Sequence, residues 1–278
     1  MIAPGHSSLD LERRIAAAIS FVRKQGRFVD VHCHCLPALD DGPGSLEESL
    51  ELCRALVEDN VGLVVATPHQ LGRYETRTDG KRISDGVRCI NRELSARGLD
   101  LVVLPGAEVR LDERICTLLA GGEILTLADR RRHILLELPS DVFIDVEPLL
   151  CAMAARNVTA VLAHPERNLP LLRHLDVVSQ WRACGLRLQV TAASIVGGFG
   201  GQAEAAAWEL LARGWVDVVA SDAHDVDMGR PRMRDACARM ADELDHRTAC
   251  RLCIANPLRV VSGQELVPVR FRMSQEAR

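Results

Sequence analysis

FVDVHCH, at residues 28–34, is a short apolar run that ends on two histidines. Six further runs of this kind follow it along the chain: GLVVATPH (62–69), LDLVVLPGAE (99–108), HILLELP (133–139), VTAVLAHPE (158–166), LRLQVTAAS (186–194) and VDVVASDAH (216–224). A segment of helical periodicity separates most of these runs, and apolar strands separated by helices indicate a parallel sheet that is buried on both faces. Seven such units without a linker favour a closed barrel over an open sheet, so the sequence predicts an α/β fold with a seven-stranded (β/α)7 barrel.

The helical segments carry their own start signals and apolar faces. The clearest begins at Ser45, which with Glu48 forms a capping box ahead of a periodic apolar pattern. The sequence predicts helices over 45–60, 84–97, 146–156, 171–183, 202–213 and 233–244.

The first 27 residues stand apart from this alternation. Residues 8–25 have the pattern of an amphipathic helix, with Leu11, Ile15, Ala18 and Val22 on one face. We therefore expect an N-terminal helical extension over 1–27 and a single barrel domain over 28–278.

The composition of the 278 residues argues against several classes of protein. With 34 basic and 38 acidic residues the net charge is −4, and only nine residues are aromatic, so neither the charge nor the stacking surface of a nucleic-acid-binding protein is present. No apolar run approaches a membrane span, and Asp10 and Glu12 precede the apolar stretch near the N-terminus, which argues against a signal peptide. The ten cysteines are scattered, mostly inside apolar patterns such as those around Cys53, Cys89 and Cys151. They predict reduced core thiols in a soluble cytoplasmic protein.

Six of the seven apolar runs end on side chains that can bind a metal ion. In a β/α barrel the carboxyl ends of all strands meet at one mouth, so these side chains should lie together. Asp41, in the loop after the first run, is a natural further member. The candidate ligands are His32, His34, Asp41, His69, Glu108, Glu137, His164, Asp222 and His224.

Any one of these nine residues, taken alone, could be an ordinary buried group. The other four histidines of the chain are interpreted in that way: His6, His133, His174 and His246. Five imidazoles and four carboxylates crowded together are different, because buried charges are very costly without compensating cations. The set is large enough for two or three divalent ions. Histidine and carboxylate ligands are more typical of a site for Mn, Zn or Fe ions than of a structural zinc site. Cys33 and Cys35 alternate with His32 and His34 and should point away from them.

These motifs resemble those of the PHP (polymerase and histidinol phosphatase) superfamily, and most closely the bacterial protein-tyrosine phosphatases linked to capsule and exopolysaccharide synthesis. The matching segments span residues 30–261 in family order: DVHCHCLPALDDGPGSLEESLEL, VVATPH, LPGAEVR, LLELP, VLAHPER, QVTAASIVGGFG, VVASDAHD, GRP and IANPLRVV. The resemblance implies a distorted seven-stranded barrel of PHP type with a trinuclear site, whose ligands would be the nine residues above and whose metal would most readily be manganese. It also implies phosphate contacts from Arg167 and Arg230.

The function expected from this resemblance is hydrolysis of phosphotyrosine in a protein, with a bacterial tyrosine kinase of capsule or exopolysaccharide synthesis as the partner. Two alternatives stay open: a small-molecule phosphatase similar to histidinol-phosphate phosphatase, and a metal-binding regulator without catalysis. We expect no nucleic-acid partner and no membrane insertion, and the oligomeric state is left open.

One pattern points to a different chemistry. Cys253 and Arg259 have the spacing found in cysteine-dependent tyrosine phosphatases. The segment between them contains no glycine, and Pro257 removes one of the backbone N–H groups that would have to hold the phosphate. We therefore predict that Cys253 is a buried structural thiol.

Overall fold

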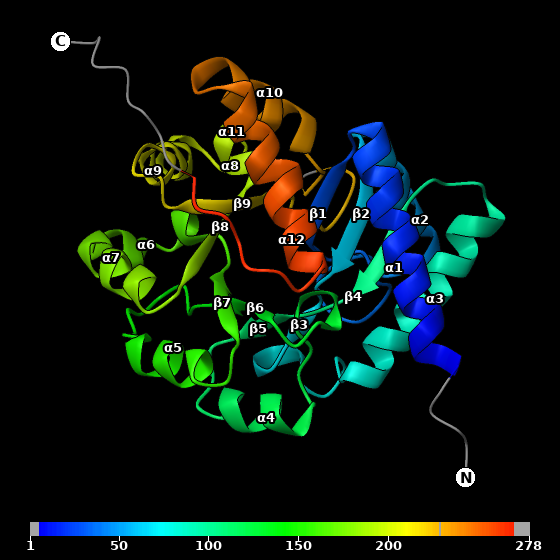
Figure 1. Cartoon of the computed structure of the whole chain (residues 1–278), viewed down its shortest axis with the longest axis horizontal. Helices are drawn as coiled ribbons and strands as arrows, with labels where there is room; N and C mark the ends of the chain where they lie inside the picture. The colour runs from blue at the N-terminus through cyan, green and yellow to red at the C-terminus, as the bar shows by residue number, and fades with distance from the viewer. Residues whose placement is uncertain (1–5, 228, 270–278) are drawn as a thin grey trace.

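Nine strands alternate with helices in the part of the chain that the structure, a computed structural model, describes (Figure 1). That part comprises residues 6–227 and 229–269, with backbone alone described for residues 6–14. The strands are β1 (Phe28–Cys33), β2 (Val61–Ala66), β3 (His69–Gln70), β4 (Val102–Pro105), β5 (Glu108–Arg110), β6 (His133–Glu137), β7 (Thr159–Leu162), β8 (Arg187–Thr191) and β9 (Val216–Ala220).

The prediction of seven strands is wrong because two of the seven apolar runs are each divided into two strands. The run at 62–69 is divided at Pro68, which has no N–H group to donate to a neighbouring strand. The run at 99–108 is divided after Pro105, at Gly106, where a Cβ atom would lie only 2.6 Å from Val65 Cγ1. Only glycine lets the backbone pass so close to the neighbouring strand.

All strand pairs are parallel, as predicted, but they form two sheets. One has the order β1-β2-β4 and the other the order β3-β5-β6-β7-β8-β9. An isolated parallel bridge between Cys33 and Ala223 joins the end of β1 to the segment after β9. The structure is therefore a parallel α/β fold whose strand pairing is split, in place of one continuous seven-stranded sheet.

Alternate side chains of the strands enter two separate hydrophobic clusters. Val29 and Val31 of β1 belong to one cluster, together with Leu63 and Val65 of β2 and residues of β4, β6, β7 and β9. Val64 and Ala66 of β2 belong to the other, which includes residues of the surrounding helices. This division follows from the alternation of side chains across a strand.

The N-terminal helix α1 (His6–Gln25) contributes to the first of these clusters. Ile15, Ala18 and Val22 are buried as predicted, whereas the side chain of Leu11 lies outside the described residues. Helix α12 (Asn256–Val261) supplies Leu258, Val260 and Val261 to the same cluster. Both helices lie on the side of the molecule that faces the viewer in Figure 1.

The remaining helices lie between successive strands, except α10 and α11, which follow β9. They are α2 (Leu46–Glu58), α3 (Gly80–Ala96), α4 (Ile115–Gly121), α5 (Glu147–Ala154), α6 (Leu169–Leu172), α7 (Leu175–Ala183), α8 (Ala192–Ile195), α9 (Gly201–Ala212), α10 (Met233–Glu243) and α11 (His246–Cys250). Ser45 caps α2 by accepting a hydrogen bond from Glu48 N, which confirms the predicted start. The predicted helix 171–183 is interrupted between α6 and α7. None of the helices in the described part of the chain has the length and hydropathy needed to cross a bilayer.

The ten cysteines are all free thiols. Cys53 is buried as predicted, but the expectation of core thiols is wrong for Cys151, which is exposed, and only partly right for Cys89. Helix α5 buries Leu150 and Met153 and so turns Cys151 outward.

Candidate metal centre

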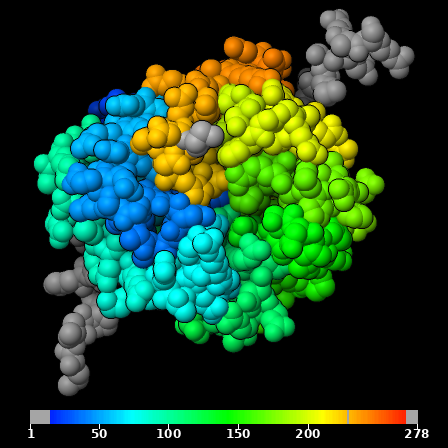
Figure 2. Space-filling view, turned by 180° about the vertical axis from the view of Figure 1, so that it is seen from behind, coloured from blue at the N-terminus to red at the C-terminus, as the bar shows by residue number. Residues whose placement is uncertain are grey.

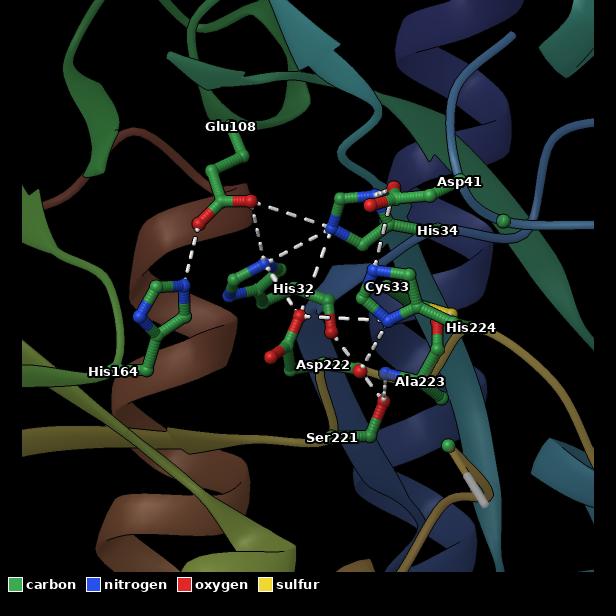
Figure 3. A network of polar contacts seen from close by, with 12 residues as sticks. His32, Cys33, His34, Asp41, Glu108, His164, Ser221, Asp222, Ala223 and His224 are labelled. Atoms are coloured by element: carbon green, nitrogen blue, oxygen red, sulfur yellow. Dashed lines mark hydrogen bonds and ion pairs between the residues drawn. The ribbon is translucent and has the colours of Figure 1, made fainter. Parts of the chain in front are cut away.

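The ends of the strands bring all nine predicted ligand residues together. Residues 28–34 carry His32 and His34, β3 begins at His69, β5 begins at Glu108 and β6 ends at Glu137. The register aligns two of these strands, because His69 pairs with Glu108. Backbone hydrogen bonds from Asp222 N to His32 O and from His34 N to Ala223 O hold the segment after β9 against β1. His32, His34, Asp222 and His224 therefore share one site (Figure 3).

The nine side chains form four overlapping groups, and within each group the candidate ligand atoms lie within 4.8 Å of one another. The groups are His34, Asp41, His69 and His224; His32, His164 and Asp222; His32, His34 and Glu108; and His69, Glu108 and Glu137.

Glu108 lies at the centre of these groups. Its Oε2 atom is 3.4 Å from Nε2 of both His32 and His34 and 3.1 Å from Nδ1 of His69. Its Oε1 atom is 2.9 Å from Nε2 of His164. This carboxylate therefore faces four imidazoles, of which Figure 3 labels His32, His34 and His164, and it is only 1% exposed.

The hydrogen bonds on the far side of the imidazoles fix which nitrogen carries a proton. His32 Nδ1 lies 2.9 Å from Gln189 Oε1, and His34 Nδ1 lies 2.7 Å from Asp40 Oδ2; both oxygens are acceptors, so each Nδ1–H donates. In neutral rings the two Nε2 atoms then carry lone pairs. They face one another at 3.3 Å and also face the carboxylates of Glu108 and Asp222. Acceptors that face acceptors need a cation between them, and the donor set fits a divalent metal ion.

The shifts in the pKa values of the cluster also indicate that the site requires positive charge. Burial lowers the pKa of His34, but the carboxylates of Asp40 and Glu108 outweigh it and raise the pKa to about 10. Burial raises the pKa of Glu108, but the charges of His32 and His164 outweigh it and hold the pKa well below its usual range. The carboxylates thus stay ionised, and either protons on the imidazoles or metal ions must balance them.

Two of the nine residues have an unusual backbone. His164 has φ 33° and Asp222 has φ 54°, both in the left-handed region that favours glycine. Such conformations cost on the order of 1–3 kcal/mol each and persist only where the surroundings fix them. Each lies two residues after the end of its strand, β7 or β9, so the strain lies at the cluster itself.

Three residues with buried side chains that support the ligands were missed by the sequence reasoning. Asp40 holds His34 as described and also accepts a hydrogen bond from His69 N at 3.0 Å. Gln189 of β8 holds His32. Asp30 of β1 accepts hydrogen bonds from Ser221 and from His32 N, and burial raises its pKa to about 6. A signal existed for each, since Asp40 neighbours Asp41 and the other two are polar residues inside apolar strand runs.

The two arginines predicted to contact phosphate lie in different places relative to the cluster. Arg167 Nη2 is 2.8 Å from Asp222 Oδ2, so its guanidinium reaches the cluster. Arg230 is exposed and lies beside helix α2 in a pocket with Glu51 and Glu58, and it has no hydrogen bond or ion pair with any described residue.

Residues that the sequence reasoning left out of the site also lie outside the cluster. His133 and Cys253 are buried elsewhere, and His246 is exposed. The thiol of Cys253 contacts Cys237, and this contact together with burial raises its pKa well above the usual value. The predicted burial of Cys253 is confirmed, and its structural role stays a prediction. Cys33 and Cys35 belong to the cluster of hydrophobic residues under the helices, so they point away from His32 and His34 as predicted.

A parallel α/β fold with nine ligand-type side chains at its strand ends defines a class of protein, one with a candidate multinuclear metal centre. Residues 28–262 match the family model described as capsular polysaccharide synthesis, CpsB/CapC, and the chain belongs to this family.

Known relatives agree with this assignment. The chain is 34% identical over 200 residues to the tyrosine-protein phosphatase YwqE of Bacillus subtilis, covering 71% of this chain and 78% of the relative. It is 32% identical over 207 residues to the putative tyrosine-protein phosphatase CapC of Staphylococcus aureus, covering 74% and 80%. A solved structure from a study of YwqE of B. subtilis and CpsB of Streptococcus pneumoniae, described as unique metal-dependent tyrosine phosphatases, superposes with a TM-score of 0.80 at 29% identity. That match covers 87% of this chain and 99% of the other.

Proposed function

We propose that this protein is a metal-dependent protein-tyrosine phosphatase, which hydrolyses phosphotyrosine in a protein substrate. The observation that carries the proposal is the set of imidazole Nε2 lone pairs that converge on the buried carboxylates of Glu108 and Asp222. The family and the named activities of YwqE, CapC and CpsB support the substrate class.

The nine residues of the cluster would hold two or three divalent ions, with Mn preferred and Fe or Zn as alternatives. Glu108 would hold more than one of them, since its two oxygens face imidazoles of all four groups. When bound, such ions supply Lewis-acid activation of water and of the phosphoryl oxygens.

The residues of the chain then orient and neutralise the substrate. Asp40 and Gln189 hold the rings of His34 and His32 in one orientation. Arg167 is close enough to the cluster to meet charge on the phosphoryl oxygens. Arg230 is assigned to the same role on the resemblance alone, since its side chain lies in the pocket beside helix α2. A tyrosine leaving group has a pKa of about 10 and so needs less help from a general acid than an alkyl alcohol does.

The two parallel sheets together form the distorted barrel of PHP type that this chemistry uses. The bridge between Cys33 and Ala223 connects the two sheets. Residues 28–278 form this domain, and residues 1–27 form an extension that contains α1, since the family match begins at residue 28.

The partner of this activity is a bacterial tyrosine kinase of capsule or exopolysaccharide synthesis, and the site of action is the cytoplasm. The description of the family supports the link to capsule synthesis. A histidinol-phosphate phosphatase activity and a regulatory role without catalysis are the competing functions.

Metal analysis combined with turnover of a phosphotyrosine peptide tests the proposal. We expect two to three transition-metal equivalents per chain, turnover of the peptide, and loss of turnover with a chelator. His32→Ala should lose activity by orders of magnitude, whereas His246→Ala, at an exposed histidine outside the cluster, should keep it. Less than one metal equivalent under metal-replete conditions, or turnover of small phosphates without turnover of the peptide, would overturn the proposal.

A further inference from the structure

A pocket of about 210 Å³ opens directly beside the candidate metal centre. Its lining includes two of the proposed ligands, Glu137 and His164, and the proposed phosphate contact Arg167. Whatever is attached to a phosphoryl group bound at the centre can therefore extend into this pocket.

The other walls of the pocket suit a flat apolar group. Leu138, Leu162 and Pro165 line it, and Ser140 lies at its exposed side. A cavity of about 150 Å³ is enough to hold benzene, so the volume here is sufficient for one phenyl ring. Arg167 adds a guanidinium, whose planar face attracts the face of an aromatic ring.

Arg167 is itself held by an aromatic ring. Its guanidinium carbon lies 4.6 Å from the centroid of Phe199, while Nη2 of the same group reaches Asp222 at 2.8 Å. Phe199 is 42% exposed, an unusual position for one of the few aromatic residues of this chain.

Phe199 lies in a tight, glycine-rich turn that holds its side chain at the surface. Gly197 and Gly200 flank it with φ 78° and φ 85°, and Gly200 N donates a hydrogen bond to Gly197 O across the turn. Gly198 N donates to Ala193 O at 2.7 Å and so ties the turn to α8. The turn follows β8, on the face of the molecule where the segments after the strands gather: blue after β1, cyan after β3, green after β7, yellow after β8 and gold after β9 (Figure 2).

We propose that the pocket lined by Glu137, Leu138, Ser140, His164 and Arg167 receives the aromatic ring of the substrate, and that Phe199 is a positioning residue that holds Arg167 as one wall of this pocket. The proposal deepens the phosphatase function and rests on it. It assigns the preference for an aryl over an alkyl phosphate monoester to named residues outside the metal ligands.

Two variants test the space in the pocket and the role of Phe199 separately. Ser140→Trp fills the pocket from its exposed side, and Phe199→Leu removes the aromatic face but keeps an apolar side chain. Phe199→Tyr restores the face. Phe21→Ala is the matched control, because Phe21 is also an exposed phenylalanine next to an arginine, Arg27, but lies on α1.

The measurement compares probes with and without a ring. For each manganese-loaded variant, the ratio of kcat/KM for phenyl phosphate to that for ethyl phosphate is determined, so that the different leaving-group chemistry cancels between variants. Binding of benzylphosphonate and of methylphosphonate, which are not hydrolysed, is measured by calorimetry as a readout independent of turnover.

We expect benzylphosphonate to bind more tightly than methylphosphonate. Ser140→Trp and Phe199→Leu should each reduce that advantage, and the ratio of kcat/KM, by about tenfold. Phe199→Tyr and Phe21→Ala should leave both unchanged. Equal binding of the two phosphonates, or ratios unaltered in Ser140→Trp and Phe199→Leu, would overturn the inference while leaving the phosphatase activity in place. Absence of turnover with every phosphate ester would instead refute the proposed function, and the phosphonate measurements would still decide on the pocket.

Discussion

Asp40 gives the sharpest test of how the candidate metal centre is held. Its side chain is 1% exposed, and it accepts three hydrogen bonds: from His34 Nδ1 and His69 N at Oδ2, and from Gly42 N at Oδ1. Asp40→Asn keeps the shape but replaces one acceptor with a donor. In either orientation of the amide, one N–H group faces another, which costs about 1–3 kcal/mol of folding free energy.

Asp40→Asn should lower the affinity for metal more than it lowers the stability of the fold. Without the carboxylate, His34 is less basic and less firmly oriented, and loss of such an outer partner lowers metal affinity by roughly 10–100-fold. Isothermal titration of Mn²⁺ into metal-free protein measures this directly. Asp85→Asn, at an exposed carboxylate paired with Lys81, is the control.

The pH dependence of this effect has a definite sign. The charge of His34 holds the pKa of Asp40 below its ordinary value despite burial, so its contribution is present above the ordinary Asp range and is lost on acidification below it. The difference in affinity between the wild type and Asp40→Asn should therefore persist at neutral pH. An affinity within twofold of wild type in a folded Asp40→Asn protein would refute this account of the centre.

Three further predictions concern groups at and away from the centre. Arg167→Ala should cost about 2–4 kcal/mol in kcat/KM for a phosphotyrosine peptide, and Arg167→Lys should recover little because an ammonium lacks the planar fork; an unchanged kcat/KM would remove Arg167 from the site. Cys253→Ser should keep most activity, since Cys253 is fully buried away from the cluster, and loss of turnover in a folded, metal-loaded variant would overturn the metal mechanism. Burial lowers the pKa of His133 to about 4, so stability should fall between about pH 6.5 and pH 4, by on the order of 3 kcal/mol, as the unfolded chain takes up the proton first. Chemical denaturation of the wild type and of His133→Leu across this range checks the prediction, and equal slopes would contradict it.

The sequence alone predicted that the ligand-type residues lie together, because nearly all of them follow a positional rule. All but Asp41 lie at or near the end of an apolar run, and parallel strands carry such ends to one place, as the pairing of His69 with Glu108 shows. No rule of this kind identifies the residues behind the ligands. Gln189 lies in the middle of a strand, and only the tertiary structure reveals that its side chain meets His32.

The strand count could not be read from hydrophobicity for a related reason. Pro68 and Gly106 interrupt the hydrogen bonding of runs that are otherwise continuously apolar, and the requirement for glycine at 106 arises from a contact with Val65 on another strand. Apolar periodicity likewise placed Cys151 in the core, although a short helix has only one buried face.

The crowding of imidazoles and carboxylates around Glu108 would make metal ions stabilise the folded state in addition to the catalytic role proposed for them. Metal-free chain must balance these buried charges with protons, so the native state loses stability when metal is withdrawn. By mass action, a free metal concentration 100 times the dissociation constant stabilises the native state by about 2.7 kcal/mol. A change of that size shifts the steady-state amount of many proteins in a cell severalfold. The supply of metal would then set how much of this protein exists, and not only how fast each molecule works.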